Sequence, residues 1–237
     1  TNTPIYSSSK ILFDTGKIFT DTQKNYLDKI SKKINLQKFK DILKIIQNLK
    51  VLVIGETIID KYTFSQTIGK ASKDPILVIK EKNDIIFLGG AASVAQNIKG
   101  ICRNVDFLSE IGPEKIYKSF INKKLKNVNK IFINRKNSST IVKKRYVDEI
   151  SNRKLLGVYN IDNSNIEKAN SKIYNFLKQN IKKYDLIVVS DYGHGLIDNK
   201  ISQMIVKKAN NVFLNCQLNS NNIGFHSMKR YKGSKNV

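Results

Sequence analysis

Continuous and periodic apolar runs alternate along the chain and predict two kinds of element. Short runs of β-branched residues, such as 50–55 (KVLVIG) and 185–190 (DLIVVS), are typical of strands buried on both faces of a sheet. Segments with apolar residues three and four positions apart predict helices, and they separate most of these strands. Strands that alternate with helices indicate right-handed β-α-β crossovers. We therefore expect an α/β fold with a mainly parallel sheet and helices on both faces.

Two groups of strands are predicted. The first group alternates with helices and covers residues 50–55, 105–112, 130–134, 185–190 and 211–216. The second group breaks that rhythm: residues 76–88 (ILVIKEKNDIIFL) predict two strands around a turn at 82–84, and residues 139–147 and 154–160 predict a polar-faced pair. We expect this second group to form a small, separate β lid.

The chain is expected to begin with a helical N-terminal extension or linker, residues 1–49, before the main domain at residues 50–237. Thr20 and Gln23 have the spacing of a capping box, and the apolar residues that follow keep helical spacing with a break near Asn35.

Polar residues also mark the starts of two later helices. Ser164 and Glu167 predict a capping box for a long helix that runs to about Lys183, and Asp198 predicts the cap of the next helix.

Composition limits the classes of protein that fit. The 237 residues are 41% hydrophobic, and no apolar run approaches the ~20 residues that a membrane-spanning helix needs. No signal-peptide pattern is present, so we expect a cytoplasmic protein without a membrane partner. The two cysteines, Cys102 and Cys216, are too few for a disulfide scaffold or a closed zinc site, and we expect buried reduced thiols and no metal site.

The formal net charge of +23 raises the question of a nucleic-acid partner. Only five of the 42 basic residues are Arg, the residue on which specific nucleic-acid readers depend. The lysines are spread evenly, and no zinc-finger, RNP-type or basic-zipper pattern occurs. A solvated lysine surface is therefore favoured, and a basic nucleic-acid-binding protein remains an alternative.

Unusual residues follow several predicted strands, at the sheet edge where open α/β sheets bind ligands. Asp60 comes shortly after the strand 50–55, and its carboxylate can accept hydrogen bonds from substrate hydroxyls. Gly89 and Gly90 open a helix whose free N–H groups a ligand can approach closely. A surface Asp in a loop and a tightly packed helix–sheet turn are the competing interpretations.

The segment DYGHG follows the strand 185–190. Its continuation GHGLID approaches the dinucleotide fingerprint, but Asp198 occupies the third glycine position, which counts against a dinucleotide enzyme. His194 is either a proton carrier or phosphate contact, or an exposed loop residue without a role. For His226 we favour the exposed residue without a role.

Four segments in this order resemble the ribokinase-like (PfkB) carbohydrate kinases: VLVIGETIIDKY, FLGGAASVAQNI, TIVKKRYV and LIVVSDYGHGLI. The nearest likeness is to the heptose 7-phosphate kinase branch, in which a kinase domain is joined to a sugar nucleotidyltransferase domain. The resemblance covers about residues 50–237 and implies a three-layer α/β fold with a β lid over the sugar. It also implies ATP-dependent phosphorylation of a sugar or sugar phosphate by the parent protein, with ATP and Mg²⁺ as cofactors.

The resemblance also implies roles for individual residues. Asp60 would hold substrate hydroxyls, the two glycines would line the sugar site, and Ser93 stands where that branch often has Asn, which alters one sugar contact. Lys143 and Arg145 are candidates for an anionic sugar phosphate, with ordinary lid surface charge as the alternative. The substrate-binding candidates are Asp60, Gly89, Gly90, Ser93, Lys143, Arg145 and Asp191, and the nucleotide-side candidates are Asn215 and Gln217.

Two motifs of that family do not occur in the chain. Its catalytic aspartate lies in a G-A-G-D segment, and an Asn-x-x-Glu motif is linked to its magnesium ion. We therefore expect a C-terminally truncated fragment, inactive alone, with its catalytic base beyond Val237. A homodimer formed through the lid and a fused nucleotidyltransferase domain are further expectations. A non-catalytic sugar-binding or regulatory module is the alternative.

Overall fold

The computed structural model describes residues 19–135, 138–162, 166–218, 222 and 226–234. The chain divides into two compact units, Thr1–Ile46 and Gln47–Val237. The predicted capping box of Ser164 and Glu167 lies outside the residues and side chains that are described.

The N-terminal unit contains the helix α2 (Asp21–Lys33) and most of α3 (Leu36–Asn48). The predicted capping box is confirmed: the Gln23 N–H donates to Thr20 Oγ1 at 3.3 Å, and the Thr20 N–H donates to Gln23 Oε1 at 2.8 Å. The helical pattern breaks near Asn35, as predicted, and the Asn35 side chain accepts from the N–H of Lys38 at the start of α3.

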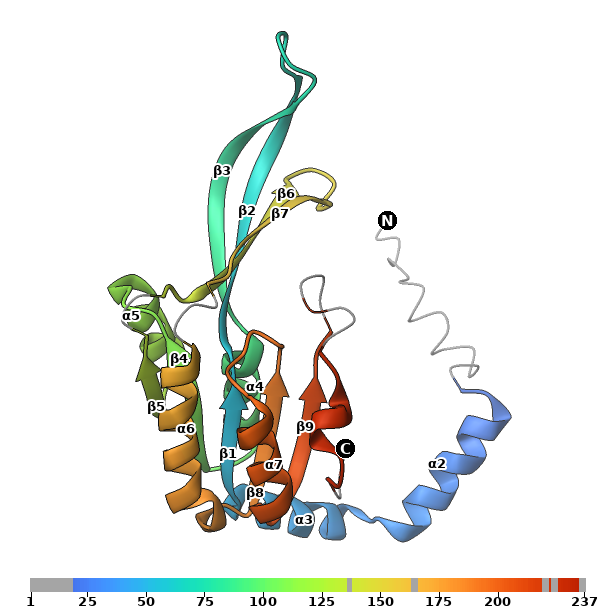
Figure 1. Ribbon diagram of the computed structural model, residues 1–237. Helices are drawn as coiled ribbons and strands as arrows, with labels where there is room; N and C mark the ends of the chain where they lie inside the picture. The colour runs from blue at the N-terminus through green and yellow to red at the C-terminus, as the bar shows by residue number, and fades with distance from the viewer. Residues whose placement is uncertain (1–18, 136–137, 163–165, 219–221, 223–225, 235–237) are drawn as a thin grey trace, which may run out of the picture. The chain divides into compact units, whose positions relative to one another are not determined.

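The second unit is built on a five-stranded sheet in which every neighbouring pair is parallel (Figure 1). The strand order is β5–β4–β1–β8–β9. The strands are β1 (Lys50–Gly55), β4 (Asn104–Ile111), β5 (Asn129–Asn134), β8 (Leu186–Asp191) and β9 (Val212–Cys216). These are the apolar runs of the first predicted group, and the mainly parallel α/β fold is confirmed.

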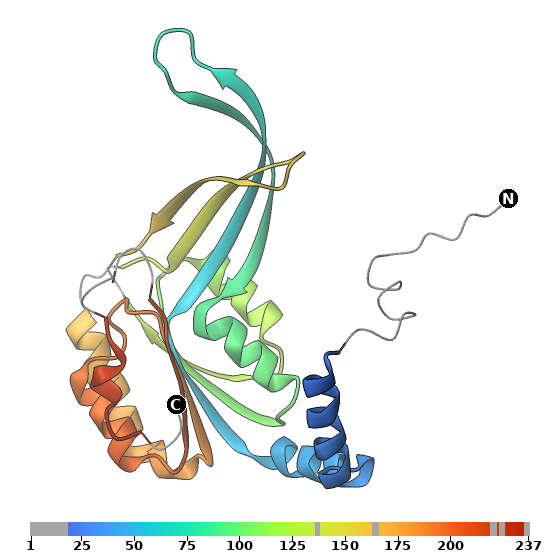
Figure 2. The same cartoon turned by 90° about the vertical axis from the view of Figure 1, so that its right-hand side faces the viewer.

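Helices cover both faces of this sheet, as expected (Figure 2). The helix α4 (Gly90–Lys99) packs on one face against β1, β4 and β8. The helices α6 (Ile166–Asn180) and α7 (Asn199–Lys208) pack on the other face, and α5 (Lys115–Lys124) follows β4 in the chain. The predicted cap of α7 is confirmed, because Asp198 Oδ1 accepts from the Ile201 N–H at 2.8 Å.

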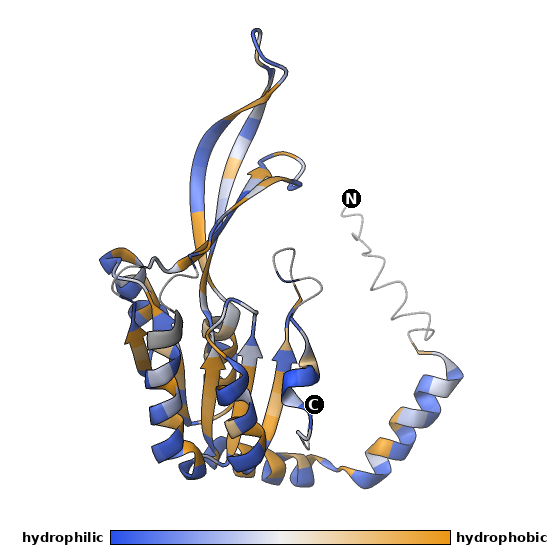
Figure 3. Cartoon of the chain, in the orientation of Figure 1, coloured by the Kyte–Doolittle hydropathy of each residue, from blue (hydrophilic) through white to orange (hydrophobic). Residues whose placement is uncertain are grey.

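The apolar core lies between the central strands and the helices α6 and α7. In Figure 3 the strands are mostly orange while both helices carry blue on their outer surfaces, as amphipathic helices on a buried sheet should. The core side chains include Leu52, Ile54, Ile173, Leu177, Ile187, Val189, Ile201 and Ile205. None of the helices in the described part of the chain has both the length and the apolar character that a membrane crossing requires.

A second sheet forms the predicted β lid, with the strand order β3–β2–β6–β7. Its strands are β2 (Thr57–Lys70), β3 (Leu77–Gly89), β6 (Ile141–Asp148) and β7 (Lys154–Asn160). The strands β2 and β3 pair antiparallel into a ribbon that extends well past β6 and β7 (Figure 1).

The predicted boundaries of the lid were wrong in two respects. Residues 76–88 do not contain two strands around a turn at 82–84, because β3 is a single strand through that segment, with a register shift at Lys82. The connection between β2 and β3 lies at residues 71–76 instead. The strand β2 was not predicted at all. It is buried near β1 and exposed toward its far end, so it lacks the continuous apolar run by which the other strands were found.

Candidate functional site

Charged and aromatic side chains meet on one face of the lid. Asp60 on β2 is in register with Lys143 on β6, and Tyr62 is in register with Arg145 two positions further along. Residues opposite each other, or two positions apart on one strand, point to the same face of a sheet. Asp60 is therefore held within a strand beside both predicted cations, and the competing interpretation of it as a surface residue in a loop was wrong.

Arg145 pairs directly with Asp60. Its Nη1 lies 2.5 Å from Asp60 Oδ1, and both side chains are half-buried. The guanidinium carbon also lies 5.4 Å from the ring centroid of Tyr62 and 5.7 Å from that of Tyr159. The two rings and the carboxylate fix the position of the guanidinium. A planar guanidinium can stack on aromatic rings and pair with a carboxylate at the same time, as Arg does at many binding sites.

Lys143 is buried, with 8% of its surface exposed. Its Nζ lies 5.6 Å from the ring centroid of Tyr159 and 5.8 Å from that of Tyr192. Burial lowers the pKa of Lys143, and the nearby Asp60 carboxylate opposes that shift. Among the described residues, no carboxylate lies within ion-pair distance of this ammonium. Two rings alone leave its hydrogen-bonding capacity available to an anionic ligand.

The two glycines lie at the root of the lid, and protein atoms fill the space beside them. A Cβ at Gly89 would lie 2.2 Å from Asp60 Oδ2, and one at Gly90 would lie 2.5 Å from the main-chain oxygen of Glu56. Gly90 also has a φ of +56°, which L-residues rarely adopt. Ser93 Oγ donates to the main-chain oxygen of Gly90 at 2.9 Å. Close packing therefore accounts for glycine at both positions, and their contact with a sugar stays a prediction.

A buried carboxyl group, Glu56, connects β1 to the loop after β8. Glu56 is fully buried, and its two oxygens accept from the N–H groups of Tyr192 at 2.8 Å and His194 at 3.0 Å. Burial, reinforced by the negative charge of Asp191, raises the pKa of Glu56 to about 8. Glu56 is not among the candidates predicted from the sequence. The available signal was a carboxylate directly after a fully apolar strand.

Asp191, at the end of β8, is buried. Two histidines lie near it: His194 in the loop that follows, and His226 from a later segment. Asp191 Oδ2 accepts from the Tyr231 hydroxyl at 2.7 Å, and Oδ1 accepts from the Gly193 N–H at 3.0 Å. The carboxylate is thus engaged inside the protein, and its contact with substrate stays a prediction. His194 and His226 are 2% and 4% exposed, so the interpretation of them as exposed loop residues was wrong.

The imidazole of His194 is neutral in this environment. Burial, with the positive charge of Lys143 as a second cause, lowers the pKa of His194 to about 4. Its Nε2 has no hydrogen-bond partner among the described residues. At neutral pH this side chain therefore adds no charge next to Lys143.

The nucleotide-side candidates lie at the end of the neighbouring strand β9. Asn215 is in register with Ser190, and both Asn215 and Gln217 are exposed. The Gln217 N–H donates to the main-chain oxygen of Asp191 at 2.8 Å, which holds the segment after β9 against the end of β8.

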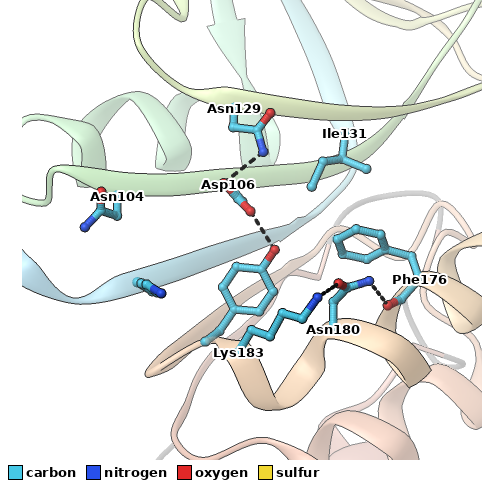
Figure 4. Close-up of a pocket in the computed structure, with 9 residues that line it drawn as sticks. Asn104, Asp106, Asn129, Ile131, Phe176, Asn180 and Lys183 are labelled. Carbon is cyan, nitrogen blue, oxygen red and sulfur yellow. Dashed lines mark hydrogen bonds between the residues drawn. The ribbon is translucent and has the colours of Figure 1, made fainter.

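A separate pocket of about 520 Å³ lies at the opposite, amino-terminal edge of the sheet (Figure 4). Asp106 is central to it: its two carboxylate oxygens accept from the Tyr184 hydroxyl at 2.6 Å and from Asn129 Nδ2 at 3.1 Å. On the other wall, Lys183 Nζ donates to Asn180 Oδ1 at 2.8 Å. These polar groups bond to one another, which indicates a structural role for them. The lid residues lie at the opposite edge of the sheet from this pocket.

The chain has relatives among curated proteins and shares its fold with solved structures. No family model matches the chain. The bifunctional protein HldE of Aliarcobacter butzleri is 34% identical over 164 residues, and that of Campylobacter jejuni (strain RM1221) is 32% identical over 163 residues. These alignments cover 68% and 69% of this chain and 34% of each relative. The chain therefore spans about a third of the length of the curated relatives it matches.

Among solved structures, phosphofructokinase-2 from Escherichia coli, in complex with fructose-6-phosphate, aligns with a TM-score of 0.51. The alignment covers 70% of this chain and 54% of that chain at 14% sequence identity, a level at which the likeness concerns the fold alone. The chain is a homologue of the HldE bifunctional proteins and has the fold of the ribokinase-like (PfkB) carbohydrate kinases.

Proposed function

We propose that this chain is the sugar-binding part of a carbohydrate kinase domain, and that the parent protein transfers the γ-phosphate of ATP to a heptose 7-phosphate or a similar sugar phosphate. The relation to HldE and the ribokinase-like fold support a sugar-phosphate kinase. The observation that carries the choice of an anionic sugar is the buried Lys143 ammonium, which aromatic rings surround and no described carboxylate pairs. A phosphate group on the substrate would supply the missing partner.

The other lid residues have complementary roles in this proposal. Asp60 accepts hydrogen bonds from sugar hydroxyls, and its pair with Arg145 holds the carboxylate in position for them. Tyr62 and Tyr159 provide flat apolar surfaces beside the same charges. The helix that begins at Gly90 and the loop that follows Asp191 would form the floor beneath the sugar.

ATP and Mg²⁺ belong to the complete domain in this proposal. Asn215 and Gln217 are exposed at the end of β9 and would face the nucleotide. The 237 residues contain no G-A-G-D segment, so no described residue is assigned as the catalytic base, and this chain is expected to bind without turnover. The relatives are named bifunctional proteins, which supports a second activity in the parent protein. We propose that this second activity is that of a nucleotidyltransferase.

The experiment compares two ligands, a heptose 7-phosphate and the free heptose, by isothermal titration calorimetry on this chain. We expect the phosphate ester to bind at least ~10-fold more tightly, because a charge-assisted hydrogen bond contributes about 1.5–3 kcal/mol. Lys143→Met should remove this preference without changing the affinity for the free sugar. Asp60→Asn should weaken the binding of both ligands.

Lys80→Met is the matched control, because it removes the same charge from an exposed position on the lid strand β3. It should leave both affinities unchanged. If the ester binds equally well to the wild-type chain and to Lys143→Met, Lys143 is not the phosphate contact. If neither ligand binds the folded wild-type chain, the sugar-binding proposal itself is wrong.

A further inference from the structure

Three side chains of different chemical type converge behind the loop that follows β8. Asp191 ends β8, Cys216 ends β9, and His226 lies further along the chain. One carboxylate oxygen, the thiol sulfur and one ring nitrogen all lie within 4.8 Å of one another. Asp191 and His226 are buried, and Cys216 is half-buried.

A single ring nitrogen is the meeting point of this cluster. His226 Nε2 lies 3.1 Å from Cys216 Sγ, 3.5 Å from Asp191 Oδ1 and 3.4 Å from the main-chain oxygen of Asp191. If Nε2 carries the ring proton, one proton is shared among the sulfur and two Asp191 oxygens; if it does not, the Cys216 thiol donates to Nε2 and the two Asp191 oxygens face a nitrogen without a proton. A cation placed between the three side chains would satisfy them together.

We propose that Asp191, Cys216 and His226 bind a divalent metal ion of the Zn²⁺ class. Carboxylate, thiolate and imidazole are the donors that Zn²⁺ takes in proteins, at about 2.0–2.3 Å. Donor atoms 3.1 and 3.5 Å apart, with the third separation no longer than 4.8 Å, can all be reached from one central point at such lengths. The main-chain oxygen of Asp191 is the nearest candidate for a fourth ligand.

The surroundings hold the ligands in place. The Tyr231 hydroxyl and the Gly193 N–H donate to the Asp191 carboxylate, as the outer partners of a metal-bound carboxylate do. Arg230 Nη1 lies 3.8 Å from Asp191 Oδ2, whereas His226 Nε2 is nearest to the other carboxylate oxygen, Oδ1. Burial, together with the Asp191 charge, raises the pKa of the Cys216 thiol, so metal binding would release the thiol proton.

The test uses Co²⁺ as a spectroscopic probe for Zn²⁺, with this chain purified free of metal. We expect one Co²⁺ per chain, a thiolate-to-cobalt charge-transfer band in the near ultraviolet, and displacement of the band by Zn²⁺. Cys216→Ser should abolish the band, and His226→Gln should weaken the affinity for Co²⁺ at least ~10-fold.

Cys102→Ser is the matched control, because Cys102 is the second thiol of the chain and lies between α4 and β4, outside the cluster. It should keep the band and the affinity. Circular dichroism verifies that each variant is folded, and His226→Gln provides the comparison if Cys216→Ser does not fold. The proposal is overturned if the wild-type chain gives no charge-transfer band, or if the band persists in Cys216→Ser. Neither result depends on sugar binding or phosphate transfer.

Discussion

Gly90 is the residue at which the lid ends and the helix α4 begins, and its backbone conformation makes it a sensitive position. A methyl group there would require a non-glycine residue at φ +56° and would lie 2.5 Å from the main-chain oxygen of Glu56. We expect Gly90→Ala to lower the free energy of unfolding by about 1–3 kcal/mol, measured by urea denaturation.

Gly157→Ala is the control for this substitution. The new methyl group would have only the Tyr159 ring near it, at 3.3 Å, and the backbone of β7 needs no left-handed conformation at that position. Its stability should stay within about 0.5 kcal/mol of the wild type. If Gly90→Ala and Gly157→Ala are equally stable, the backbone at position 90 does not require glycine.

Two buried groups give the protein a defined dependence of stability on pH. Glu56 keeps its proton up to about pH 8 when folded but only up to about 4.5 when unfolded, so the folded state holds more protons between these values. The free energy of unfolding therefore falls as pH rises through that range. His194, whose pKa is lowered from 6.5 to about 4 in the folded state, has the opposite effect between those two values. The two effects oppose each other below pH 6.5.

The fall in stability should therefore be concentrated between pH 6.5 and 8. At 1.36 kcal/mol per pH unit, we expect a decrease of about 2 kcal/mol across this range, measured by urea denaturation at constant ionic strength. Glu56→Gln should remove most of the decrease, because an amide does not titrate. A wild-type protein that is equally stable at both pH values would show that Glu56 is not held protonated.

At the scale of the elements, a buried ion pair joins β4 to the segment after β5. Arg135 Nη1 lies 2.8 Å from Glu110 Oε1, and the two side chains are 3% and 4% exposed. Removing one partner of such a pair leaves the other buried and unpaired, which typically costs 3–5 kcal/mol. We expect Arg135→Met to destabilise the protein by about that amount in urea denaturation.

The exposed Arg153 offers a control with the same chemical change, and Arg153→Met should alter stability by less than about 0.5 kcal/mol. Adding Glu110→Leu to Arg135→Met should recover part of the lost stability, since no unpaired carboxyl group remains. An Arg135→Met variant as stable as the control would show that the pair contributes nothing.

The sequence indicated most directly the strands whose side chains are largely buried, which are β1, β4 and β8. The strands of the five-stranded sheet are apolar on both faces, and that pattern has one structural meaning in a chain of this kind. The ribbon of β2 and β3 leaves the core, so its outer half is polar. The segment at 82–84 then resembles a turn, but the strands pair on both sides of it, and the structure has only a register shift at Lys82.

The candidate site was predictable only as far as strand ends and motifs could indicate it. Asp60, Lys143 and Arg145 were selected in advance, and the structure places them on one face of the lid. The aromatic residues around them and the buried Glu56 were not selected, because sequence spacing does not reveal which side chains a β-lid brings together. The Asp191, Cys216 and His226 cluster was hidden for the same reason, since its members come from two strand ends and a later segment.

At the scale of the whole molecule, the lid and the net charge act on association in opposite directions. We propose that two copies pair through the lid. Its exposed apolar residues are Ile68, Ile76, Leu77, Ile85, Phe87, Leu156, Val158 and Tyr159. A formal charge of +23 on each chain opposes the pairing at low salt. Sedimentation equilibrium should therefore show dimerisation that strengthens as the NaCl concentration increases.

Val158→Lys should weaken this dimer, whereas Ile101→Lys, which adds the same charge at an exposed position outside the lid, should not. A monomer at every salt concentration would contradict pairing through the lid. Nucleic-acid binding has the opposite salt dependence, because it weakens as salt increases. Five lysines line a groove of about 640 Å³ between α6 and α7, namely Lys178, Lys182, Lys200, Lys207 and Lys208, and a salt titration with duplex DNA tests them.

The strand β9 has one partner, β8, in the part of the sheet that is described, and its Phe213 side chain is 57% exposed. An edge strand is a template for pairing with another chain, and in a concentrated sample we expect the matching edge of another copy to pair with it. The storage life of the purified protein should therefore be governed by its concentration more than by its melting temperature, with turbidity developing while every molecule is still natively folded.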